Sequence, residues 1–126
     1  MSEIKFFVCE HCGNLVRVIN DAGVPMICCG QKMTELKANS VDASQEKHVP
    51  VVEILNGEVK VTVGSVEHPM VEEHSIQWIY LLTDKGDQFK KLTPGITPQV
   101  KFKLADEKPI AVYEYCNLHG LWVAKV

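Results

Sequence analysis

The sequence predicts a mainly β protein in which a small four-cysteine metal module, residues 1–37, precedes a β-sandwich or barrel, residues 38–126. From Pro50 onward, short stretches of alternating apolar and polar residues recur with turn signals between them, a pattern typical of such folds. No stretch shows convincing helical periodicity. Four of the five cysteines lie in the first segment, which is too small to bury a sufficient core without a metal or a similar cross-link.

The first segment has two strand-like stretches, residues 5–8 and 15–19. Each ends in polar turn residues and glycine: Cys-Glu-His-Cys-Gly follows the first stretch, and Asn-Asp-Ala-Gly follows the second. Residues 38–45 are small and polar, so we expect a linker between the two parts of the chain.

The second part contains a hairpin and several further strands. Asn56-Gly57 lies between two apolar stretches, residues 51–55 and 58–63, and this dipeptide is the strongest short-range hairpin signal. The other predicted elements are a long apolar strand at 75–83, a turn at 84–87, an alternating strand at 100–104, and a closing pair at 110–115 and 121–126. Trp78, Tyr80 and Trp122 lie on these strands among aliphatic residues, so we expect them in the core.

Composition argues against several classes of function. The formal net charge of −3 leaves no basic surplus to neutralise phosphates, which disfavours nucleic-acid binding. No apolar run approaches the roughly 20 residues of a membrane helix. The first residues carry Glu3 and Lys5 and lack the long apolar core of a signal peptide. We therefore expect a cytoplasmic protein with no nucleic-acid or membrane partner.

The cysteine pattern indicates a metal site rather than disulfides, because the count is odd and no export signal is present. Cys9 and Cys12 form a Cys-x2-Cys pair, and the adjacent Cys28 and Cys29 follow. Two such pairs brought together give a tetrahedral all-sulfur site, which suits zinc or iron. On spacing alone, structural zinc is at least as good an interpretation as iron. His11, between the first two cysteines, is expected to be an exposed turn residue.

The remaining cysteine, Cys116, and the other four histidines form a second candidate constellation: His48, His68, His74 and His119. Each lies at a predicted strand end or in a loop, where a rigid sheet can present side chains to one point. Four imidazoles and a thiolate exceed the four ligands of a structural zinc site and suit a five-coordinate ion with one open position. Spacing does not choose between iron, copper and zinc. A blue-copper site is disfavoured, because no methionine follows His119.

Five motifs occur in order over nearly the whole chain: Cys9-Glu-His-Cys12-Gly-Asn, Cys28-Cys29-Gly, Glu46-Lys47-His48-Val-Pro-Val, Gly64-Ser-Val-Glu-His68-Pro-Met and Glu114-Tyr-Cys116-Asn-Leu-His119-Gly. Together they resemble the desulfoferrodoxin family, the two-iron class of superoxide reductase from anaerobic bacteria. The resemblance implies a desulforedoxin-like module followed by an immunoglobulin-like β-sandwich. It also implies two iron ions, the first bound by Cys9, Cys12, Cys28 and Cys29, and the second by His48, His68, His74, His119 and Cys116.

The reaction of that family is the one-electron reduction of superoxide to hydrogen peroxide, without the oxygen release of a dismutase. The resemblance implies that Lys47 steers superoxide and that Glu46 closes onto the ferric iron after turnover. Glu67, Glu72 and Glu73 are candidates for orienting His68 or His74. The family's usual electron donor is rubredoxin, and its usual assembly is a homodimer.

Two other interpretations stay open from the residues alone. In the first, both irons only shuttle electrons, and six ligands saturate the second iron. In the second, zinc holds together a β-sandwich that serves as a binding module, which leaves the four histidines and Cys116 without a purpose. Neither the identity of the metals nor an electron path between the sites follows from the sequence.

Overall fold

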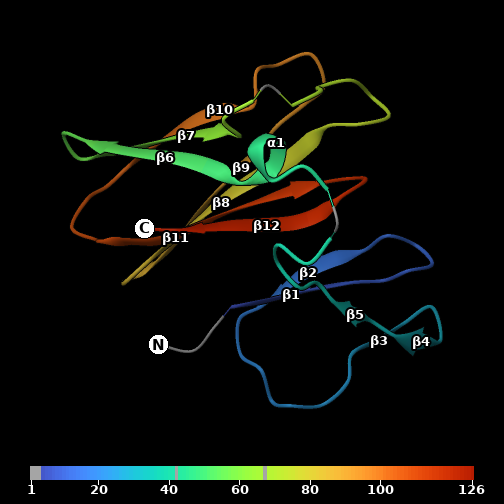
Figure 1. Ribbon diagram of the computed structural model, residues 1–126. Helices are drawn as coiled ribbons and strands as arrows, with labels where there is room; N and C mark the ends of the chain where they lie inside the picture. Colours follow the sequence, from blue (N-terminus) through green and yellow to red (C-terminus); the bar gives the residue numbers. More distant parts are fainter. Residues whose placement is uncertain (1–3, 42, 67) are drawn as a thin grey trace. The chain divides into compact units, whose positions relative to one another are not determined.

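The computed structural model describes residues 4–41, 43–66 and 68–126, and the chain divides into two compact units, Met1–Lys37 and Ala38–Val126. Almost all of its regular structure is β-strand (Figure 1), which confirms the mainly β prediction. The helix α1 (Gln45–His48) has four residues, and no helix in the described part of the chain is long and apolar enough to cross a membrane.

The first unit is built around one short antiparallel sheet. The strands of this unit are β1 (Lys5–Val8), β2 (Leu15–Val18), β3 (Ile27–Cys28), β4 (Gln31–Lys32) and β5 (Thr34–Glu35). β1 is the central strand between β2 and β5, and β3 pairs with β4 in a separate hairpin. Among the described residues of this unit, only Phe6 and Cys9 are buried. So small a core leaves the unit dependent on a cross-link such as a bound metal.

The second unit is a β-sandwich of two antiparallel sheets. Its strands are β6 (Pro50–Leu55), β7 (Glu58–Val63), β8 (Ile76–Thr83), β9 (Gly86–Lys91), β10 (Gln99–Lys103), β11 (Pro109–Cys116) and β12 (Gly120–Lys125). One sheet has the order β10-β7-β6 and the other the order β12-β11-β8-β9. The core contains Val59, Val61, Ile79, Phe102 and Val112, all of them fully buried. The predicted sandwich is confirmed.

The hairpin of β6 and β7 shows how local sequence sets the register. Asn56 and Gly57 have φ values of 52° and 76°, the left-handed pair that a two-residue hairpin turn requires. In β7 the three valines are buried and the intervening polar residues are partly exposed, as the alternation predicts. The hairpin predicted at Asn56-Gly57 is therefore confirmed, and Trp78, Tyr80 and Trp122 are buried as expected.

Two expectations about local structure are wrong. The helix α1 was not predicted, because four residues are too few to show helical periodicity. The turn after β8 contains only Asp84 and Lys85, since Gly86 already pairs with Thr83 as the first residue of β9. β9 lies at the edge of its sheet and is mostly polar and exposed, so it lacks the apolar alternation that identifies a strand.

The segment predicted to be a linker is anchored at Asn39. The Asn39 side-chain oxygen accepts a hydrogen bond from Val123 N at 2.9 Å, and its Nδ2 donates to the Val123 carbonyl at 3.1 Å. The Asn39 backbone N–H donates to the Leu121 carbonyl at 3.0 Å. These bonds cover backbone groups of β12, an edge strand. Composition does not reveal this anchoring, because asparagine is equally common in free turns.

Helix α1 is held by backbone contacts to the connection that follows β7. Val66 N donates to the Glu46 carbonyl at 2.8 Å, and the Ser65 hydroxyl donates to the same oxygen at 3.3 Å. A Cβ on Gly64 would overlap that oxygen and would lie 2.7 Å from the Lys47 carbonyl carbon. Glycine at position 64 is therefore what allows the two backbones to approach so closely.

Strand β11 places one carboxyl group inside the sandwich. Glu114 lies opposite Ile79 of β8 and has no exposed surface. Neither of its carboxyl oxygens has a hydrogen-bond partner among the described residues. Burial raises the pKa of Glu114 to about 9, so the group is a neutral acid at pH 7.

We expect Gly64→Ala to destabilise the second unit by about 1–3 kcal/mol, because the added methyl group meets backbone atoms that cannot swing aside. Urea unfolding followed by circular dichroism measures this free energy. Ser65→Ala is the matched control: it removes one exposed hydroxyl contact and should change the stability by less than about 0.5 kcal/mol. Equal stabilities of the two variants would show that α1 does not depend on the close approach.

We expect Glu114→Gln to raise the free energy of unfolding at pH 7 by roughly 2–3 kcal/mol. The folded-state pKa of about 9 exceeds the ordinary value of 4.5, so folding above pH 4.5 requires proton uptake by Glu114. The wild-type chain therefore loses stability as the pH rises from 4.5 towards 9, and the glutamine variant does not. Urea unfolding over this pH range tests the difference, and a gain in stability that is independent of pH would contradict a buried neutral acid.

Candidate metal centres

All four cysteines of the first unit come together in the structure. Cys9 and Cys12 lie in the turn after β1, Cys28 ends β3, and Cys29 begins the following turn. Their four sulfur atoms lie within 4.8 Å of one another. Four thiols at this spacing can surround one ion as a tetrahedral all-sulfur site.

The backbone around these thiols favours their convergence. The Cys9 carbonyl accepts a hydrogen bond from Gly13 N at 2.8 Å, and the Cys12 N–H points at the Cys9 sulfur at 3.5 Å. Cys29 has a φ of 53°, a left-handed conformation that is uncommon for a residue with a side chain. Such a conformation costs about 1 kcal/mol or more and persists where the surroundings enforce it. Here it directs two adjacent cysteines at the same point.

The thiols of Cys9 and Cys29 differ in how readily they ionise. The pKa of Cys9 is lowered to about 6, chiefly by the backbone N–H of Cys12. The pKa of Cys29 is raised to about 12, chiefly by its hydrogen bond with the Cys12 thiol. Four thiolates so close together need a cation to compensate their charge, so the residues fit a metal ion. His11 is exposed and lies outside this cluster, as expected.

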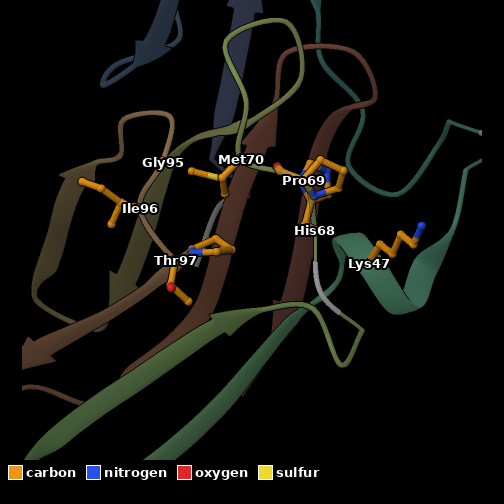
Figure 2. A pocket seen from close by; sticks show the side chains of 8 residues that line it. Lys47, His68, Pro69, Met70, Gly95, Ile96 and Thr97 are labelled. Carbon is orange, nitrogen blue, oxygen red and sulfur yellow. The ribbon is translucent and has the colours of Figure 1, made fainter.

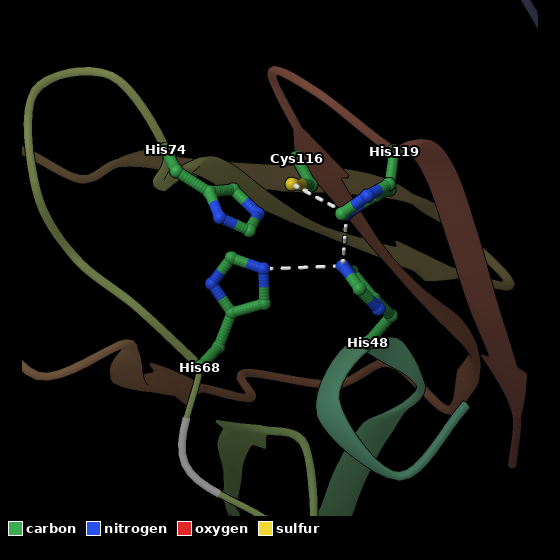
Figure 3. A group of neighbouring side chains, drawn as sticks. All are labelled: His48, His68, His74, Cys116 and His119. Atoms are coloured by element: carbon green, nitrogen blue, oxygen red, sulfur yellow. Dashed lines mark hydrogen bonds between the residues drawn. The ribbon is translucent and has the colours of Figure 1, made fainter. Parts of the chain in front are cut away.

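A second cluster joins the four remaining histidines to Cys116 (Figure 3). His48 ends α1, His68 and His74 lie in the connection between β7 and β8, Cys116 ends β11, and His119 lies in the turn before β12. One nitrogen of each ring and the Cys116 sulfur lie within 4.8 Å of one another. The structure thus brings together all five residues that the sequence singled out, with His48 on a helical turn rather than in a loop.

Two of these rings have their tautomers fixed by backbone carbonyls. His48 Nδ1 lies 2.7 Å from the Ser44 carbonyl oxygen, and His68 Nδ1 lies 2.7 Å from the Pro69 carbonyl oxygen. A carbonyl oxygen only accepts hydrogen bonds, so each Nδ1 carries the proton and each Nε2 presents a lone pair. Carbonyls at Ser44 and Pro69 therefore orient these rings. The Glu72 and Glu73 side chains proposed for this role are exposed, and Glu67 lies outside the described residues.

The two lone pairs face each other inside the protein. His48 Nε2 and His68 Nε2 are 3.1 Å apart, but neither nitrogen has a proton to donate in these tautomers. Protonation is opposed by burial, which lowers the pKa of His68 to about 4 and also lowers the pKa of His48. Two bare nitrogens at this distance repel each other unless they share a cation. The geometry therefore fits a metal ion between them.

The other three donors complete the set. His119 presents Nδ1, which lies 3.1 Å from His48 Nε2 and 3.9 Å from the Cys116 sulfur. His74 Nε2 is buried and has no hydrogen-bond partner among the described residues. Burial raises the pKa of the Cys116 thiol, and the backbone N–H groups of Leu118 and His119 oppose that rise. Four imidazole nitrogens and one sulfur can bind iron, copper or zinc, and they are one ligand more than structural zinc uses.

Trp122 is a residue of this site that the sequence assigned only to the core. Its ring stacks on the His48 ring, with centroids 4.9 Å apart and planes inclined by 19°. Its Nε1 donates to the His119 carbonyl at 3.1 Å. Trp122 therefore restrains two of the donors, a role for which the sequence carries no signal because 74 positions separate the stacked residues, from 48 to 122.

A cleft of about 450 Å³ borders the cluster (Figure 2). Its walls include Lys47, His68, Pro69 and Met70, together with residues 95–98. Lys47 is exposed, and its ammonium group points away from His68. Its positive charge nevertheless contributes to the lowered pKa values of His48 and His74, after burial and the neighbouring histidines. Glu46 is exposed on the same helical turn.

Comparison with known proteins identifies the family. The desulfoferrodoxin family matches residues 40–125, and the family described as the desulfoferrodoxin N-terminal domain matches residues 2–36. The chain is 47% identical over 120 residues to a desulfoferrodoxin of Syntrophotalea carbinolica, covering 95% of this chain and 94% of that protein. It is 44% identical over 124 residues to a desulfoferrodoxin of Nitratidesulfovibrio vulgaris, covering 98% of both chains.

Solved structures agree with this result. The superoxide reductase of Treponema pallidum has a TM-score of 0.83 and 42% identity, covering 98% of this chain and 100% of that one. The one-iron superoxide reductase of Giardia intestinalis has a TM-score of 0.56 and 32% identity, covering 64% of this chain and 97% of that one. With both parts of the chain matched and the full-length similarity high, the chain belongs to the desulfoferrodoxin family.

Proposed function

We propose that this chain is a superoxide reductase, which reduces superoxide by one electron to hydrogen peroxide. The observation that carries the proposal is the cluster of four imidazoles and one thiol beside an open cleft. Ferrous iron bound by His48, His68, His74, His119 and Cys116 would supply the electron. Five protein donors would leave room for the substrate as one further ligand, which distinguishes this proposal from a saturated site that only carries electrons.

The charges of the ligands favour a small anion as substrate. His48 and His68 are neutral in the tautomers that their backbone partners fix, and burial opposes the protonation of His74 as well. Cys116 supplies one negative charge when it ionises, so the ligand set leaves a divalent ion with net positive charge. The thiolate also donates electron density, as the cysteine ligand does in haem-thiolate enzymes. Both effects assist reduction of a bound superoxide anion.

Lys47 and Glu46 are proposed as the catalytic side chains outside the ligand set. Lys47 lines the cleft next to His68, so its charge can raise the local concentration of superoxide although the whole chain is acidic. Glu46 lies on the same turn as His48 and is proposed to occupy the open position after turnover. Its side chain is exposed, and the pKa of its carboxyl group is lowered by its own backbone N–H and by the Ser44 hydroxyl.

The two units are proposed to have different roles. Residues 1–37 would form the desulforedoxin-like module, whose iron held by Cys9, Cys12, Cys28 and Cys29 is a one-electron site in a supporting role. Residues 38–126 would form the superoxide reductase domain. By analogy with the family we also propose a rubredoxin-like electron donor, a homodimer and a cytoplasmic location.

Product stoichiometry tests the activity. The reduced, iron-loaded chain with excess electron donor should form one hydrogen peroxide per superoxide consumed and release no oxygen, whereas a dismutase forms one peroxide per two superoxides. Cys12→Ser, which alters only the four-cysteine site, should retain the reaction in a single turnover. Absence of superoxide consumption by protein that holds iron in the second unit would refute the proposal and favour a carrier of electrons.

Lys47→Ala should lower the second-order rate constant for superoxide by about tenfold, because a focused charge near the site raises the association rate. Lys47→Arg should keep most of the rate, and Lys101→Ala on the exposed face of β10 is the control for loss of one positive charge. Stopped-flow kinetics at low and high salt measure the effect, which screening should diminish. An equal loss in Lys101→Ala would show that only net charge matters.

A further inference from the structure

We infer that Asn117 is a positioning residue that holds His74 in the donor cluster through hydrogen bonds to the backbone on both sides of that histidine. The inference depends on the metal site of the proposed function but not on the reaction with superoxide. Asn117 lies between two members of the cluster, Cys116 and His119, so anything it holds is tied to the hairpin that carries them.

Three hydrogen bonds make the connection. Asn117 Oδ1 accepts from Ser75 N at 2.9 Å, and Asn117 Nδ2 donates to the Glu73 carbonyl at 2.8 Å. The Asn117 backbone N–H donates to the Ser75 carbonyl at 3.3 Å. The amide side chain thus binds the residue before His74 and the residue after it. Only an amide offers an acceptor and a donor in this arrangement, because a carboxylate accepts only.

His74 needs such support more than its neighbours do. The rings of His48 and His68 are each oriented by a backbone carbonyl at 2.7 Å. The His74 ring makes no hydrogen bond to any described residue, and its inward nitrogen Nε2 is buried without a partner. Its backbone forms an isolated bridge with Val71, which closes a tight turn but does not join the turn to the rest of the cluster.

The position of His74 is therefore set through the main chain. Its ring meets the rings of His68 and His119 edge-on, with centroids 4.7 Å and 5.1 Å away. In Figure 3 it lies on the same side of the cluster as Cys116. Loss of the Asn117 amide would free the segment around His74 on both sides at once. Partners of this kind typically contribute a factor of about 10–100 to metal affinity.

The test measures cobalt binding, because Co²⁺ reports each site by its own visible bands. Asn117→Ala should weaken Co²⁺ binding at the histidine-rich site by about tenfold or more and shift its thiolate-to-metal band. The four-cysteine site in the same sample is the internal control and should be unaffected. Asn117→Asp keeps the acceptor for Ser75 N but sets a second acceptor against the Glu73 carbonyl, so it should also weaken Co²⁺ binding at the histidine-rich site.

Gln88→Ala is the matched control for loss of a hydrogen-bonded amide. Gln88 Nε2 donates hydrogen bonds to the Lys103 carbonyl at 2.8 Å and to Glu107 Oε1 at 3.1 Å. Gln88 lies on β9, near the turn that joins β8 to β9. This variant should change the stability of the unit and leave both cobalt sites as in the wild type. If Gln88→Ala weakens Co²⁺ binding as much as Asn117→Ala does, the effect is general destabilisation and the inference is wrong.

A double-mutant cycle identifies the residue through which Asn117 acts. In a His74→Ala background, Asn117→Ala should change the Co²⁺ affinity by less than about twofold, because the donor that it positions is gone. The inference would be overturned if the losses of Co²⁺ affinity in the two single variants multiplied in the double variant. It would also be overturned if Asn117→Ala had the Co²⁺ affinity and the spectrum of the wild type. Should Asn117→Ala not fold, Asn117→Asp carries the same cycle, since it retains one of the two side-chain bonds.

Discussion

His48 Nε2 and His68 Nε2 lie 3.1 Å apart in the interior of the second unit, each with a lone pair directed towards the other. This arrangement follows from the carbonyls of Ser44 and Pro69, which hold the protons on the opposite ring nitrogens. Burial lowers the pKa values of both rings, so protonation does not relieve the repulsion. A shared divalent ion turns an unfavourable contact into two bonds, and the folding of this region is therefore coupled to metal binding.

Several other contacts hold these two rings and the remaining donors in place. Gly64 allows α1 to lie against the connection after β7, Trp122 stacks on His48 and binds the His119 carbonyl, and Asn117 joins its hairpin to the residues around His74. The Gly64 and Asn117 contacts hold backbone segments and the Trp122 ring packs on His48, and none of these three residues belongs to the group of five donors. The cleft beside His68 and Lys47 leaves access for a small anion.

The sequence predicts which residues form the two clusters and that the second unit is a β-sandwich. Thiols, imidazoles and the period-two alternation of apolar residues can all be recognised in the sequence itself. It does not predict which ring nitrogens face inward, since that depends on carbonyls placed by the fold. Glu73 illustrates the limit: its carboxylate was the candidate, but its backbone carbonyl makes the contact with Asn117. The burial of the Glu114 carboxyl group and the stacking of Trp122 on His48 cannot be predicted for a related reason, because both arise only when distant strands pair.

A crystal structure of the reduced, iron-loaded chain, with anomalous scattering recorded at the iron edge, would show whether the facing nitrogens of His48 and His68 bind one metal ion. We expect one iron in the second unit, bound by Nε2 of His48, His68 and His74, Nδ1 of His119 and the Cys116 sulfur, with no further protein ligand. Iron bound through Nδ1 of His48 or His68, or a sixth protein ligand on the iron, would contradict it. Iron bound through Nε2 of both His48 and His68 would show that the metal site forms where these two nitrogens face each other.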